Sequence, residues 1–215
     1  KNKKITSKLV SYCKLHNAKL IFASSTSVYG TQNKVIAENC KTGELKPQSP
    51  YAYFKLKEEN IIKNSFKKNK HRGIILRFGT IYGYSIGMRF HTAVNKFCWQ
   101  LYQKQPISIW KTAMKQKRPY LSLIDASNAI LFIITNKLYD NQIYNIVSQN
   151  FTVEGILSIL KLYDKKIKFK LVNNKIMNQL SFEVSPKKFI NKGFTFKGNM
   201  KKEIFKTLKN LQKFS

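Results

Sequence analysis

The sequence lacks long apolar runs. None of them reaches the length of about 18 residues that a transmembrane helix requires. The lysines at positions 1, 3 and 4 are not followed by the uninterrupted apolar segment of a signal peptide. We therefore expect no membrane association and a cytoplasmic location.

Cysteine and histidine are also scarce. The three cysteines, Cys13, Cys40 and Cys98, do not have the spacing of metal ligands, and the three histidines are scattered along the chain. An odd number of widely separated cysteines is typical of reduced thiols. The sequence therefore predicts no metal site.

Acidic residues are few, with 10 Asp and Glu against 40 Lys and Arg and a formal net charge of +30. Such a charge would suggest nucleic acid as a partner. Arginine, however, occurs only four times, although its forked guanidinium is the preferred group for phosphate and base contacts. The hypothesis that the protein is a nucleic-acid-binding module therefore rests on charge alone. We interpret most lysines as solvated surface residues and expect no specific nucleic-acid partner.

The central stretch of the chain runs from Leu20 to Lys55. An apolar strand, 20–23, leads into a serine-rich exit, and Pro50 then opens a helix. On that helix Tyr51 and Lys55 are four positions apart, which places them on one face. A nearby ammonium favours the ionised phenol, so Tyr51 can exchange a proton with a substrate hydroxyl. Ser25, at the mouth of the strand, can hydrogen-bond the same oxygen.

Further motifs follow in a fixed order. Their sequences are SSTSVYG at 24–30, PYAYFK at 50–55, LRFGTIYG at 76–83, RPYLSLID at 118–125 and YNIVS at 144–148. This series resembles the extended short-chain dehydrogenase/reductases of the NAD-dependent epimerase/dehydratase family, which act on nucleotide sugars. The resemblance covers nearly the whole chain.

The resemblance implies an α/β fold. It implies the C-terminal part of a Rossmann-type doubly wound parallel sheet with a small α/β substrate-binding lobe. Residues 1–83 would form a partial Rossmann domain, and residues 84–215 the remaining sheet elements interleaved with the lobe. The family's Gly-x-x-Gly-x-x-Gly turn is absent. By resemblance about 90 residues would precede position 1, and we expect the 215-residue chain alone to bind NAD very weakly.

Apolar periodicity gives the expected elements. The expected strands are 73–78, 142–147 and 167–172, and the expected helices are 5–13, 51–70, 92–103, 126–136, 153–162 and 200–214. Asp125 is a good N-cap residue for the helix that follows it.

The resemblance also implies the site residues. The catalytic residues would be Ser25, Tyr51 and Lys55. The cofactor, NAD or NADP, would be bound by Tyr51, Lys55 and Ser24. The nucleotide-sugar substrate would be bound by Thr26, Thr80, Arg89 and Arg118. Thr80 stands where the family has an asparagine, and Ser122 replaces a usual histidine. The resemblance further implies a homodimer in the full-length protein.

The reaction type depends on the two residues after Ser25. The resembling 4,6-dehydratases have Asp-Glu there, an acid and a base for removing water, whereas this chain has Thr26 and Ser27. The sequence therefore favours redox chemistry, most simply epimerisation through a keto sugar. A nucleotide-sugar dehydrogenase or reductase, and an inactive protein without the dinucleotide-binding turn, remain as alternatives.

Overall fold

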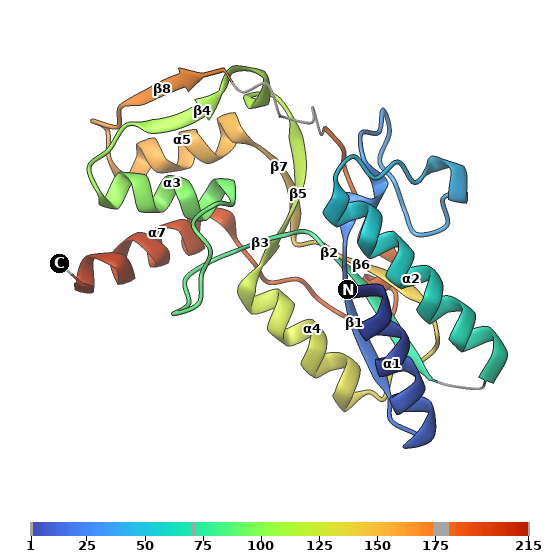
Figure 1. Ribbon diagram of the computed structural model, residues 1–215. Helices are drawn as coiled ribbons and strands as arrows, with labels where there is room; N and C mark the ends of the chain where they lie inside the picture. Colours follow the sequence, from blue (N-terminus) through green and yellow to red (C-terminus); the bar gives the residue numbers. More distant parts are fainter. Residues whose placement is uncertain (1, 70–71, 174–180, 215) are drawn as a thin grey trace.

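The first sheet of the fold has three parallel strands. The computed structural model describes residues 2–69, 72–173 and 181–214. Strand β1 (Leu20–Ser25) pairs with β2 (Gly73–Phe78), which pairs with β6 (Ile143–Ile146), in the order β1–β2–β6. All three strands run in the same direction, so their carboxyl ends lie at one edge of the sheet (Figure 1).

Helices cover both faces of this sheet. Helices α1 (Asn2–Leu15) and α2 (Pro50–Asn69) pack side by side on one face, where Ile75 of β2 joins their core. Helix α4 (Leu123–Thr135) covers the other face and packs on Ile74 and Leu76. The continuous apolar run of β2 is therefore buried from both sides, as parallel strands require.

A second lobe follows β2. Its sheet consists of β3 (Thr80–Tyr82), β5 (Lys117–Ser122) and β7 (Gln149–Thr152); β5 is parallel to β3 and antiparallel to β7. A further parallel pair is formed by β4 (Ile107–Trp110) and β8 (Phe169–Val172). The helices of this lobe are α3 (Ala93–Tyr102), α5 (Val153–Tyr163) and α7 (Met200–Leu211), whereas the short α6 (Lys187–Ile190) packs against β6 of the first sheet. Side chains from α3, α5 and α7 form one apolar core with β4.

The observed α/β architecture confirms the fold class expected from the sequence, with corrections at the level of elements. Asp125 is not the N-cap of α4: the helix begins two residues earlier, and Ser122 accepts a hydrogen bond from the backbone N–H of Ile124. Asp125 is instead buried, and it accepts hydrogen bonds from the backbone N–H groups of Lys197 and Gly198. The sequence also did not predict strands β3, β4, β5 and β7.

Among the described helices, none is long and apolar enough to cross a membrane.

Candidate active site

A cavity of about 650 Å³ opens at the carboxyl ends of β1 and β2. It is lined by Ser25 from the end of β1 and by Tyr51 and Lys55 from the first turns of α2. Thr80 and Arg89 line it from the segment after β2. With Ser24, which also lies in the wall, six residues assigned to the site from the sequence line one cavity, at the edge where open parallel sheets bind their ligands.

The start of α2 places Tyr51 at the mouth of this cavity. The side chain of Ser49 accepts a hydrogen bond from the backbone N–H of Ala52 at 3.1 Å, and Pro50 occupies the first helical position. Tyr51 is 59% exposed and has no hydrogen bond among the described residues. Its hydroxyl is therefore free to meet a ligand.

Two contacts hold Lys55 in the wall of the cavity. Its ammonium donates to the backbone oxygen of Ala23 at 3.0 Å and lies 3.5 Å from a carboxylate oxygen of Glu58. The buried Glu58 also accepts a hydrogen bond from Thr6 at 2.7 Å. The sequence indicated the proximity of Lys55 to Tyr51 but not this carboxylate, which stands three positions after the lysine.

Ser25 caps the single turn that follows β1. Its side-chain oxygen accepts hydrogen bonds from the backbone N–H of Ser27 at 3.2 Å and from the Ser27 hydroxyl at 2.9 Å. Because Ser25 is the acceptor in both bonds, its own O–H can donate to a ligand oxygen.

Ser24 and Thr26, which flank Ser25, direct their hydroxyls elsewhere. Ser24 lies in the cavity wall, but its hydroxyl donates to the buried Glu59 carboxylate at 2.5 Å. Thr26 is buried and donates to the backbone oxygen of Phe78 at 3.2 Å. Thr26 is therefore outside the cavity lining, and Ser24 lines the cavity while its hydroxyl is used in a contact with α2.

A buried ion pair supports this wall. Both carboxylate oxygens of Glu59 accept from the Arg77 guanidinium, at 2.9 and 2.6 Å. The guanidinium lies 4.7 Å from the centre of the Tyr29 ring, and burial raises the pKa of Tyr29 to about 12. The pair joins α2 to β2 beneath Ser24. Sequence reasoning missed it because the two charges are 18 residues apart.

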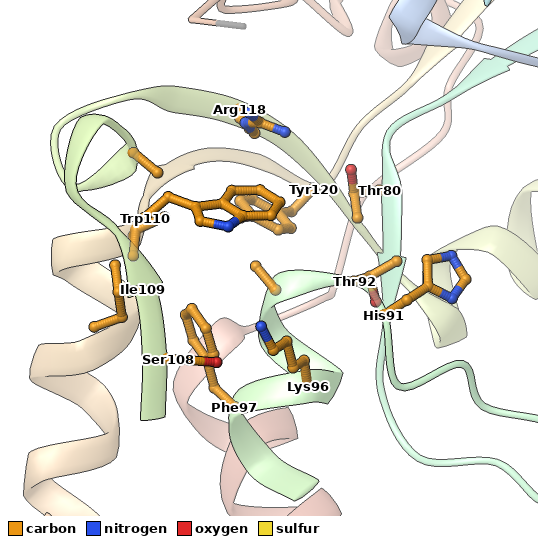
Figure 2. A pocket seen from close by; sticks show the side chains of 13 residues that line it. Thr80, His91, Thr92, Lys96, Phe97, Ser108, Ile109, Trp110, Arg118 and Tyr120 are labelled. Carbon is orange, nitrogen blue, oxygen red and sulfur yellow. The ribbon is translucent and has the colours of Figure 1, made fainter. Parts of the chain in front are cut away.

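A second cavity, of about 300 Å³, adjoins the first. Figure 2 shows Trp110 and Tyr120 within it, with Arg118 beside them. Arg118 is half-buried, which lowers its pKa, and its described hydrogen bond goes to the amide oxygen of Gln116 at 3.3 Å. No carboxylate within the described ranges forms an ion pair with it. The sequence assigned Arg118 to substrate binding, and the structure places it in this second cavity.

Residues 1–147 match the model of the NAD dependent epimerase/dehydratase family. A relative from Bacillus subtilis (strain 168), the uncharacterized UDP-glucose epimerase YtcB, is 32% identical over 136 residues, which are 59% of this chain and 39% of that protein. The match thus spans less than half of this relative.

Solved structures share the fold. UDP-glucuronic acid 4-epimerase from Bacillus cereus, in complex with UDP-glucuronic acid and NAD, is similar with a TM-score of 0.89 at 20% identity over 100% of this chain and 68% of that chain. UDP-glucose 4-epimerase from Thermus thermophilus, in complex with NAD, has a TM-score of 0.81 at 19% identity over 96% and 68%. A dTDP-glucose 4,6-dehydratase from Bacillus anthracis has a TM-score of 0.81 at 21% identity over 97% and 66%.

Proposed function

The chain belongs to the NAD dependent epimerase/dehydratase family, and we propose that the protein epimerises a nucleotide sugar through a keto sugar in an NAD-dependent reaction. The observation that carries this proposal is the convergence of Ser25, Tyr51 and Lys55 on one cavity. A hydroxyl, a phenol and an ammonium in one site are suited to moving a proton to and from a sugar hydroxyl.

In this proposal the nucleotide part of the substrate lies in the smaller cavity and the sugar lies in the larger one. The smaller cavity offers the aromatic surfaces of Trp110 and Tyr120 to a base, and Arg118 offers a guanidinium fork to phosphate oxygens. Under this proposal the sugar lies in the larger cavity beside Tyr51, and Thr80 and Arg89 are in the wall of that cavity. Under this proposal these three polar side chains, Thr80, Arg89 and Arg118, bind the substrate.

The residues present fit one end of the cofactor. Tyr51 and Lys55 are hydrogen-bond donors at the carboxyl ends of β1 and β2, where they can hold the ribose next to a nicotinamide ring. The 215 residues contain no Gly-x-x-Gly-x-x-Gly turn that would hold the pyrophosphate. When bound, the nicotinamide supplies a reversible hydride acceptor. NADP has the same reactive ring, and the cofactor-binding residues named here serve either form.

The side chains then perform the proton chemistry. Tyr51 takes the proton from a sugar hydroxyl as the hydrogen on the same carbon leaves as hydride, which gives a ketone. Ser25 donates a hydrogen bond to that oxygen in both states, and Lys55 holds positive charge near it. Once the keto sugar had rotated to present its opposite face, Tyr51 would return the proton to the oxygen while that face received the hydride from a bound nicotinamide. The product is the epimer, with no net oxidation.

Elimination of water is disfavoured at this site. The Thr26 hydroxyl points to a backbone oxygen, and no Asp or Glu stands among the described residues that line the larger cavity. Elimination would therefore lack the placed acid and base that each contribute roughly a hundredfold or more. A dehydrogenase or reductase would use the same residues and stop at the first half of the cycle.

Isotope transfer tests the proposal. A UDP-sugar with deuterium at carbon 4 is given to the full-length protein with NAD, and the products are analysed by mass spectrometry. We expect deuterium to remain at carbon 4 of both epimers. A 4-keto-6-deoxy sugar carrying deuterium at carbon 6 would contradict the proposal. Accumulation of a ketosugar with stoichiometric NADH would establish the dehydrogenase alternative instead.

We further propose that the protein is a cytoplasmic homodimer. The cysteines Cys13, Cys40 and Cys98 are all free, which supports a reducing compartment. The exposed apolar side chains Ile5, Leu9 and Tyr12 follow one another along the outer face of α1, which supports a subunit contact there.

A further inference from the structure

Three residues line both cavities, namely Thr80, His91 and Thr92. They mark the place where the smaller, aromatic cavity meets the larger one that contains Tyr51. Figure 2 shows His91 next to Thr92 and Thr80, on the side of the smaller cavity that faces away from Trp110. His91 was not among the site residues predicted from the sequence.

We propose that His91 binds the diphosphate of the nucleotide sugar and thereby helps to select nucleoside diphosphate ligands. The inference rests on the proposed function. In such a substrate the diphosphate lies between the nucleoside and the sugar. If the base occupies the smaller cavity and the sugar the larger one, the diphosphate must pass the residues that the two cavities share. Of these, only His91 can carry a positive charge.

The surroundings of His91 favour an anion. Arg89 lines the larger cavity, and Lys96 and Arg118 line the smaller one. Neither lining includes an Asp or Glu among the described residues. Helix α3 begins directly after Thr92, so its free backbone N–H groups add positive potential at the same place.

The imidazole of His91 is also free. The side chain is exposed, and no hydrogen bond to it occurs among residues 2–69, 72–173 and 181–214. Thr92, by contrast, directs its hydroxyl to the backbone oxygen of Arg89 at 3.5 Å. The ring N–H of His91 can therefore turn toward a phosphate oxygen without breaking an internal contact.

Calorimetric titration of the full chain with UDP and with uridine tests the inference, since the two ligands differ only in the diphosphate. We expect His91→Ala to weaken UDP binding by about tenfold or more and to leave uridine binding unchanged. His91→Lys, which places an ammonium at this position, should restore most of the UDP affinity. His16→Ala, which removes an exposed histidine just after α1, is the matched control and should bind both ligands as the wild type does.

The outcomes distinguish the role of His91 from the proposed function of the protein. If the wild-type chain binds UDP and His91→Ala binds it equally well, the assignment of His91 is overturned and the proposed function stands. An equal loss of UDP and uridine affinity in His91→Ala would also overturn it, because that result indicates a structural role. A wild-type chain that binds no nucleoside diphosphate would overturn both the assignment and the proposed function.

Discussion

At the scale of single residues, Tyr51 is the side chain whose replacement separates chemistry from folding. It is exposed and makes no described hydrogen bond, so Tyr51→Phe removes the exchangeable proton and little else. We expect turnover of the full-length enzyme to fall by roughly a hundredfold to ten-thousandfold, the usual contribution of a placed acid or base. The melting temperature should hardly change. Steady-state kinetics and a thermal melt check both parts.

Ser25→Ala provides the comparison at the same site. It deletes a single hydrogen bond to the reacting oxygen and should therefore cost less than Tyr51→Phe. Near-normal turnover of Tyr51→Phe on a substrate that the wild type converts would contradict the catalytic assignment of Tyr51.

The sequence predicted the residues whose spacing is local and missed those whose partners are distant. Tyr51 and Lys55 are one helical turn apart, so their common location follows from the helix alone. The pairing of Glu59 with Arg77 depends on how α2 packs on β2, which no short motif specifies. The hydroxyls of Ser24 and Thr26 donate to the Glu59 carboxylate and to the backbone oxygen of Phe78, and both partners are distant in the sequence.

At the scale of elements, helix α7 is joined to the active-site wall through Glu203. The Glu203 carboxylate is buried, accepts a hydrogen bond from the Ser122 hydroxyl, and lies against Gly83 of the cavity wall. A Cβ atom at Gly83 would come within 3.0 Å of this carboxylate, and the backbone φ of +122° also favours glycine there. The contact therefore joins α7 to the wall of the larger cavity.

Glu203 makes the stability of this contact depend on pH. Burial raises its pKa, and the nearby Asp125 charge acts in the same direction. The folded protein therefore holds the proton more tightly than the unfolded chain does. The resulting gain in folding stability is fully present below the unfolded pKa of about 4.3. It is lost as the pH rises through the folded pKa.

Glu203→Gln removes this charge while its amide oxygen can still accept from Ser122. We expect the Tm of this variant at neutral pH to rise by about 2–4 °C, which corresponds to roughly 1 kcal/mol of unfolding free energy in a chain of this size. We also expect the Tm of the variant to fall less with rising pH than that of the wild type. Glu154→Gln, at an exposed position in the first turn of α5, is the control. A fall in Tm of Glu203→Gln at neutral pH would show that the ionised carboxylate stabilises the fold.

The elements that the sequence failed to predict share a physical cause. Strand β5 begins with Lys117, Arg118 and Pro119, and β7 has no fully buried residue, so neither shows the apolar pattern of a strand. Their pairing is decided by the contacts of the second lobe. The start of α4 was misplaced because Ser122 and Asp125 are both good N-cap residues, and the folded structure uses Asp125 to hold the chain at Lys197 and Gly198.

At the scale of the whole molecule, exposed apolar side chains of the described residues include two groups on helices that cover the first sheet. One follows α1 and includes Leu9, next to α2. The other follows α4 and includes Leu131, on the opposite face of the first sheet. A homodimer could bury either surface, and we favour α1 because its exposed apolar residues recur at helical spacing beside the helix that carries Tyr51 and Lys55.

We therefore expect Leu9→Glu to convert a dimer into a monomer, because each subunit would bring an unpaired charge into a buried contact. Leu131→Glu is the matched control, with the same substitution at an exposed leucine of the other surface, and it should leave the dimer intact. Analytical ultracentrifugation of the full-length protein and of both variants distinguishes the cases. A dimer that survives Leu9→Glu and dissociates with Leu131→Glu would place the contact on α4, and a wild-type monomer at high protein concentration would exclude the homodimer itself.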